Sequence, residues 1–175
     1  MARSLFLVAA VVALLSGCAP TAVLTGTPNS TSSSTPIAAS PTVGVTAPDV
    51  GATQGWIEVD LATQMVRLRE GDKIMAEFLA STGVAISPET TTYPGVYQVQ
   101  EMIKGPIENV PGVFVSDILI YDQAVGAGIH SMPMDKAGAV LDSTLGRPAT
   151  AGCVRVEDST AVFDFARLGT TIWIH

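Results

Sequence analysis

The stretch "WIEVDLATQMVRLREGDKIMAEFLASTG", residues 56–83, decides the fold class. Apolar and polar residues alternate in two parts of it, "WIEVDL" and "MVRLRE", and a third part, "IMAEFLASTG", also indicates a strand, which ends at Gly83. Such alternation is typical of strands that bury one face. The short segments "ATQ" and "EGDK" separate the three parts and carry turn residues. We therefore expect three strands that form an antiparallel meander.

Four more segments after this meander indicate strands, and the loops between them contain prolines. The expected strands are "VYQVQEM" (96–102), "VFVSDILIY" (113–121), "GAGIHS" (126–131) and "TTIWIH" (170–175), with loops at 84–95 and 104–112. Helical signals are few, so the predicted fold is mostly β, a sandwich or an open barrel with one or two short helices.

The stronger helix signal is "EDSTAVFDFARLG", residues 157–169. Asp158 or Ser159 can cap its N-terminus, and Gly169 suits the position after its end. Its expected buried face consists of residues at helical spacing: Ala161, Val162, Phe165 and Leu168. A second short helix is expected in "MDKAGAVLDSTLG", residues 134–146.

The N-terminal segment has the features of an export signal. Arg3 precedes an apolar run from Leu5 to Leu15, which is shorter than the roughly 20 residues of a transmembrane helix. The following "LSGC" resembles the lipobox of bacterial lipoproteins, which implies removal of residues 1–17 and lipidation of Cys18. The alternative is an ordinary cleaved signal with a coincidental cysteine. A lipid on Cys18 would anchor the exported protein to a membrane, facing the cell wall.

Residues 18–54 are dominated by Thr, Ser, Pro, Ala and Gly, and indicate a flexible tether between the anchor and a folded domain. Residues 55–175 then provide one domain. The net charge of −7 and the isoelectric point near 4.6 exclude a typical nucleic-acid-binding protein. No cluster of metal ligands and no phosphate-binding loop is visible, so we expect neither a metal nor another cofactor.

Cys153 is the most informative residue of this domain. If Cys18 is acylated, Cys153 has no partner for a disulfide, so it is either a buried core residue or a reactive thiol. His130 follows two glycines and could take the proton of such a thiol, whereas His175, at the end of a strand, is expected at the surface. Gly152 would let backbone N–H groups point at an oxyanion, and Arg155 would favour a thiolate or an anionic ligand.

The segments "GIHS" (128–131) and "LGRPATAGCVRV" (145–156) resemble the catalytic domain of the YkuD-type L,D-transpeptidases. Thr150, Gly152, Cys153, Val154 and Arg155 match the motif of that family. The meander at 56–83, "TTTYPGVYQV" (90–99) and "ARLGTTIWIH" (166–175) also resemble parts of its sequence in the same order. The resemblance covers residues 55–175 and implies the family's β fold.

The resemblance implies a role for several residues. Cys153 would be the nucleophile and acyl carrier, His130 the general base and acid, and the carbonyl of Ser131 the group that orients the imidazole. The N–H groups of Gly152 and Cys153 would stabilise the oxyanion. Further residues would shape the site or contact the substrate: Thr150, Arg155 and Tyr121.

The implied activity is acyl transfer on tetrapeptide stems of peptidoglycan, which forms 3→3 crosslinks and contributes to cell-wall organisation and cell shape. Water as the acceptor would make the protein an L,D-carboxypeptidase. The family also implies that carbapenem-type β-lactams acylate the cysteine.

Two departures from the family leave alternatives open. Ala151 stands where the motif has a second histidine, and the spacer "MPMDKAGAVLDST" (132–144) is longer than usual and could form a lid. A weakly catalytic or non-catalytic peptidoglycan-binding lipoprotein of the same fold is therefore an alternative. A structural β-sandwich with Cys153 in its core, distant from His130, is another.

Overall fold

The computed structural model describes residues 46–51 and 54–175. The predicted signal segment, the lipidation site at Cys18 and most of the predicted tether lie outside the described residues. Within the described part, the domain is built mainly from strands, with one α-helix and one short 3-10 helix. None of the helices described is long and apolar enough to span a membrane.

The meander predicted at residues 56–83 is present. It consists of β1 (Gly55–Asp60), β2 (Met65–Glu70) and β3 (Lys73–Ser81), each antiparallel to the next. The turn after β1 is stabilised by Asp60, whose Oδ1 accepts the N–H groups of Ala62 and Thr63 at 3.0 Å each. The alternating burial of β2 agrees with the sequence pattern.

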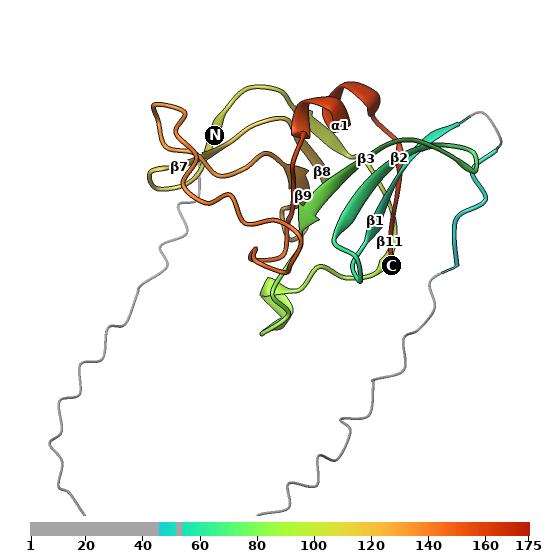
Figure 1. The fold of residues 1–175 in the computed structure, drawn as a ribbon, viewed down its shortest axis with the longest axis horizontal. Helices are drawn as coiled ribbons and strands as arrows, with labels where there is room; N and C mark the ends of the chain where they lie inside the picture. The colour runs from blue at the N-terminus through green and yellow to red at the C-terminus, as the bar shows by residue number, and fades with distance from the viewer. Residues whose placement is uncertain (1–45, 52–53) are drawn as a thin grey trace, which may run out of the picture. The chain divides into compact units, whose positions relative to one another are not determined.

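The meander is part of a nine-stranded sheet that curls into a half-barrel (Figure 1), in the order β4-β11-β1-β2-β3-β10-β9-β8-β5. Its other strands are β4 (Gly95–Gln98), β5 (Glu101–Ile103), β8 (Ile118–Asp122), β9 (Ala127–His130), β10 (Val154–Val156) and β11 (Thr171–Ile174). The strands expected at 126–131 and 170–175 are therefore confirmed, and the fold is mostly β as predicted.

The strand predicted at 96–102 is bent into two. β4 pairs with β11 at one edge of the sheet, and β5 pairs with β8 at the other edge. Between them Val99 is buried and donates its N–H to the Thr170 carbonyl at 2.9 Å, while the Gln100 N–H bonds to Ile120 at 2.8 Å. This bend lets one short segment join both edges of the curled sheet.

The strand predicted at 113–121 is also divided, at Asp117. β7 (Val113–Val115) leaves the main sheet and pairs with β6 (Ile107–Val110), a strand in a region predicted as a loop. Asp117 has a φ of +51°, and its buried carboxylate accepts hydrogen bonds from Thr160 at 2.7 Å and from Lys104 at 3.1 Å. These two polar partners stabilise the carboxylate at the corner where the chain changes direction.

The C-terminal helix is shorter than predicted. α1 spans Ser159–Phe165 and is capped by Asp158, which accepts the Ala161 N–H at 2.9 Å as expected. It ends because Ala166 is extended, so Gly169 does not follow its last turn. Leu168 is 68% exposed, and its assignment to the buried helix face is wrong.

The helix predicted at 134–146 is absent. The Asp135 carboxylate accepts the N–H groups of Ala137 and Ala139, and Gly138 adopts a φ of +87°, so the segment folds as a turn instead. Met134 then forms isolated bridges to Phe114 and Val140. The segment therefore packs on the β6–β7 hairpin as an irregular arm.

The core lies between the curled sheet and α1. Its fully buried aliphatic side chains come from β1, β2, β8, β9, β10, β11 and α1, among them Ile57, Val66, Leu119, Ile129, Val154, Val162 and Ile172. His175, predicted at the surface, is partly exposed, with 30% of its side chain accessible. Its ring stacks on Trp173 at a centroid distance of 3.8 Å, and its Nε2 lies 3.1 Å from Glu58.

Candidate active site

The sheet brings Cys153 and His130 onto neighbouring strands. β10 and β9 run parallel, with Val154 opposite Ile129 and Arg155 opposite His130. Cys153 directly precedes β10, and the backbone N–H of Gly128 on β9 points to its sulfur. Because residues two apart on a strand share a face, the thiol and the imidazole are diagonal neighbours on one side of the sheet.

The His130 imidazole is buried and held in one tautomer. Its Nδ1 lies 2.7 Å from the Ser131 carbonyl oxygen. A carbonyl can only accept, so Nδ1 carries the proton and Nε2 keeps a free lone pair. Burial, and then the positive charge of Arg155, lowers the pKa of His130 against the opposing bond to Ser131. The ring is thus a neutral base at neutral pH.

The Cys153 thiol is half-buried and is the free cysteine among the described residues. Burial raises the pKa of the thiol, and the Gly128 N–H opposes this effect in part. The resting pair is therefore a neutral thiol beside a neutral imidazole. Such a pair can form the thiolate by passing the proton to His130 as a substrate is attacked.

The loop before Cys153 is shaped by Gly152, which has a φ of +109°. A Cβ at this position would also lie 3.1 Å from the Glu89 carbonyl oxygen, so the loop requires glycine. Thr150 donates its hydroxyl to the Cys153 carbonyl at 2.5 Å. No backbone hydrogen bond from the Gly152 or Cys153 N–H is found in the described region outside the strand ladders, so both N–H groups are candidates for stabilising an oxyanion.

Thr92 is a site-shaping residue that sequence reasoning missed. Its buried hydroxyl accepts the Gly83 N–H at 2.9 Å and donates to the Gly152 carbonyl at 2.8 Å. Gly83 is equally constrained, since a Cβ there would lie 2.2 Å from the Thr90 carbonyl oxygen. Both residues stand in segments that resemble the family, "ASTG" and "TTTYPG", but the contact between them depends on tertiary packing.

Arg155 anchors the irregular segment that precedes residues 150–153, the candidate nucleophile loop. Its guanidinium is buried and donates from Nη1 to Asp142 at 2.8 Å and to the Thr144 carbonyl at 3.2 Å. Hydrogen bonds from Thr144, and then the bond from Arg155, lower the pKa of Asp142 to about 2. Ser81 donates to the same segment, at the carbonyls of Thr144 and Arg147. Arg155 therefore positions this segment.

A cavity of about 530 Å³ opens at Cys153, a size within the usual range for ligand sites. Tyr121 lines it, as predicted, with Gly152 and Ala151. Burial, and then the neighbouring Cys153, raises the pKa of Tyr121, whose ring lies 5.0 Å from that of Tyr97. His130, Ser131, Thr150 and Arg155 lie outside the cavity lining and act through the contacts described above.

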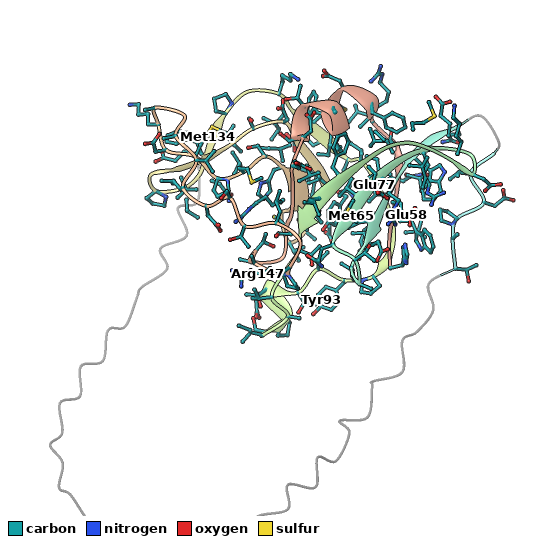
Figure 2. The ribbon with its side chains drawn as sticks, viewed as in Figure 1. Glu58, Met65, Glu77, Tyr93, Met134 and Arg147 are labelled. Atoms are coloured by element: carbon teal, nitrogen blue, oxygen red, sulfur yellow. The ribbon has the colours of Figure 1, made fainter. Side chains whose placement is uncertain are left out.

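The cavity lies at the η1 (Pro88–Thr90) side of the domain, and Tyr93, labelled in Figure 2, is one of its lining residues. A separate group of possible metal ligands, Glu58, Asp60 and His175, lies on β1 and at the end of the chain. Arg67 and Arg69 form ion pairs with these carboxylates. Because the arginines already neutralise the group, it does not fit a metal ion.

The family described as L,D-transpeptidase catalytic domain (YkuD) matches residues 54–174, more than half of the chain. No curated protein matches the chain. The structure is similar to that of an L,D-transpeptidase from Xylanimonas cellulosilytica, with 20% identity and a TM-score of 0.55 over 71% of this chain and 62% of the other.

An L,D-transpeptidase from Mycobacterium tuberculosis H37Rv is similar at 16% identity and a TM-score of 0.54, over 69% of this chain and 57% of the other. The structure of an LD transpeptidase in complex with imipenem is similar at 12% identity and a TM-score of 0.53, over 69% of this chain and 58% of the other. The chain thus spans 57% to 62% of the length of these three structures. At these identities the likeness is one of fold.

Proposed function

This chain belongs to the L,D-transpeptidase catalytic domain (YkuD) family, and from that premise we propose that it is a cysteine-dependent transpeptidase of peptidoglycan. The proposed donor is a tetrapeptide stem, and the proposed product is a 3→3 crosslink. One observation supports this reading most: a free thiol at the wall of a cavity, one strand away from a buried imidazole fixed by the Ser131 carbonyl.

In the proposed acylation step, Nε2 of His130 takes the Cys153 proton while the sulfur attacks the carbonyl carbon of stem residue three. The C–S bond forms, and the carbonyl oxygen becomes an oxyanion facing the N–H groups of Gly152 and Cys153. The bond to D-alanine then breaks, and the imidazolium gives its proton to the leaving amine. The thioester on Cys153 is the intermediate.

In the second step, the side-chain amine of another stem attacks the thioester carbonyl and releases the Cys153 thiol. Water in place of the amine would give the L,D-carboxypeptidase alternative. The non-catalytic binding alternative rests on Ala151, which replaces the second histidine of the motif. Since β9 carries His130 opposite Arg155, two residues after Cys153, His130 can serve as the base and the proposed chemistry does not need a histidine at residue 151.

The proposed localisation is an exported lipoprotein, held to a membrane through Cys18 and facing the cell wall. This proposal rests on the sequence of residues 1–18 alone. We further propose that carbapenem-type β-lactams acylate Cys153, because one structure of similar fold is a complex with imipenem.

The test of the function is the reaction of the purified protein with tetrapeptide muropeptides, analysed by mass spectrometry. We expect D-alanine release and 3→3 dimers from the wild type, and neither product from Cys153→Ala or His130→Ala. Release of D-alanine with tripeptides only would favour the carboxypeptidase. Muropeptide binding without any turnover would favour the binding protein, and dimers made by Cys153→Ala would refute the mechanism.

A further inference from the structure

The charged side chains that line the cavity at Cys153 are all acidic. Asp122 and Glu89 contribute a carboxylate each, and the described lining residues include no lysine, arginine or histidine. Ala151, at the position of the motif histidine, is exposed on the same wall and adds no positive charge. A ligand in this cavity therefore meets two carboxylates and no cationic side chain among the described lining residues.

Asp122 is fixed within the fold. It ends β8 and pairs with Ala127 on β9, the strand that carries Gly128 and His130. Its Oδ1 accepts the Ala124 N–H at 3.0 Å, and no hydrogen bond to its Oδ2 is found among the described residues. Its charge also contributes to the raised pKa of Tyr97, after burial, which places the carboxylate near the tyrosines of the cavity. One carboxylate oxygen is thus open to a ligand.

Glu89 also lines the cavity and belongs to the η1 turn. Its side chain is exposed, so it stands at the mouth rather than in the interior. The η1 turn directly contacts the nucleophile loop, because a Cβ on Gly152 would lie 3.1 Å from the Glu89 carbonyl oxygen. The two carboxylates therefore belong to different elements that both adjoin the nucleophile loop or its neighbouring strand.

We propose that Asp122 and Glu89 select the acyl acceptor by charge, favouring an amine with no carboxylate next to it over an amine that carries one. This inference rests on the proposed transpeptidase function and deepens it. After acylation, the acyl group on Cys153 no longer carries the terminal D-alanine and its carboxylate. The acceptor is then the partner on which the cavity charge acts.

The step balances without a further reactant. The acceptor ammonium, drawn to the carboxylates, loses one proton to solvent, and its nitrogen attacks the thioester carbonyl carbon. The C–N bond forms as the C–S bond breaks, and the second amine proton passes through Nε2 of His130 to the sulfur. If the acceptor carries a carboxylate beside its amine, Asp122 and Glu89 would repel that carboxylate both as the acceptor enters the cavity and as its nitrogen attacks the thioester.

The test compares two small acceptors that differ in one carboxylate, glycinamide and glycine. The protein is given a tetrapeptide stem as donor, and the rates of the two exchange products are measured by mass spectrometry at low salt. We expect Asp122→Asn to reduce the preference for glycinamide about three- to tenfold, from the loss of one unit charge several ångströms away. Glu89→Gln, at the exposed mouth, should have a smaller effect in the same direction.

Matched controls separate this effect from general charge. Asp72→Asn and Glu70→Gln remove the same charges at exposed positions around the β2–β3 turn and should leave the preference unchanged. Ala151→Lys adds a cation to the exposed cavity wall and should lower the preference as well, without altering either carboxylate. Since every variant meets the same two amines, the intrinsic reactivity of the amines cancels in the comparison.

The outcomes distinguish a failure of the charge selection by Asp122 and Glu89 from a failure of the proposed transpeptidase function. If the wild type releases D-alanine but the preference is the same in the wild type, Asp122→Asn, Glu89→Gln and Ala151→Lys, the inference is wrong and the proposed function stands. If no protein releases D-alanine from the stem, the proposed function fails and the inference with it. A preference that rises in Asp122→Asn would also overturn the inference.

Discussion

Replacing Thr92 by valine is predicted to damage both the stability and the reactivity of the site. Valine has nearly the same shape as threonine but cannot hydrogen-bond, so the Gly83 N–H and the Gly152 carbonyl both lose their partner. Both glycines are buried, and each unsatisfied group typically costs about 1–3 kcal/mol. The free energy of unfolding should therefore fall by about 2–6 kcal/mol, a large part of the roughly 5–15 kcal/mol typical of a domain.

Thr92→Ser is the matched control, because it keeps the hydroxyl and removes one methyl group, at a typical cost of about 0.5–1.5 kcal/mol. Urea denaturation of the purified proteins gives the two free energies of unfolding, and the rate of Cys153 acylation by a carbapenem gives the reactivity. A displaced nucleophile loop should slow acylation by up to about 100-fold in Thr92→Val. If the two variants agree within about 0.5 kcal/mol and acylate at the same rate, Thr92 does not hold the loop as described.

Three further predictions concern the same loop and its base. Because burial and then Arg155 lower the pKa of His130, the acid limb of the rate of Cys153 acylation should have its midpoint below the ordinary histidine value of 6.5, and a midpoint above it would contradict the assignment. Arg155→Met removes that positive charge, so the midpoint should move to higher pH in the same assay; an unchanged midpoint would show that Arg155 does not act on His130. Gly152→Ala should lower the free energy of unfolding by more than Gly112→Ala, for which roughly 1–2 kcal/mol is expected. Gly112 also has a positive φ, but a Cβ there would have no atom within 4 Å. Equal losses in the two variants would argue against the contact between residue 152 and Glu89.

Most individual strands and the C-terminal helix were predictable from the sequence, while the bend that joins the two edges of the curled sheet was not. The meander at 56–83 follows from the alternation in its first two segments and from the turn residues between the segments, and Asp158 is a strong capping residue followed by apolar helical spacing. The bend at Val99–Gln100 has no such signal, because both halves of 95–103 alternate like one strand and only their separate partners, β11 and β8, divide them. The helix expected at 134–146 failed because the Asp135 side chain binds the backbone as a turn.

The candidate site was predictable where a motif carries it. The chemistry of a thiol and an imidazole already linked Cys153 to His130, and the family resemblance added their roles and that of the Ser131 carbonyl. In the structure, His130 lies on β9 beside β10, which Cys153 directly precedes, and its Nδ1 lies 2.7 Å from the Ser131 carbonyl oxygen. The bonds of Thr92 to the loop and of Arg155 to Asp142 join positions far apart or in an irregular segment, so no local pattern reveals them. The acidic character of the cavity likewise appears only when η1 and the end of β8 are seen together.

The central claim is that Cys153 is the nucleophile and that His130 activates it. Incubation with a carbapenem, followed by proteolysis and mass spectrometry of the peptides, tests it most directly, because peptide mapping separates Cys153 from Cys18. The predicted result is one stoichiometric adduct on the peptide that contains Cys153, formed at a strongly reduced rate in His130→Ala and not at all in Cys153→Ala. An adduct elsewhere in the chain, or an undiminished rate in His130→Ala, would contradict the claim.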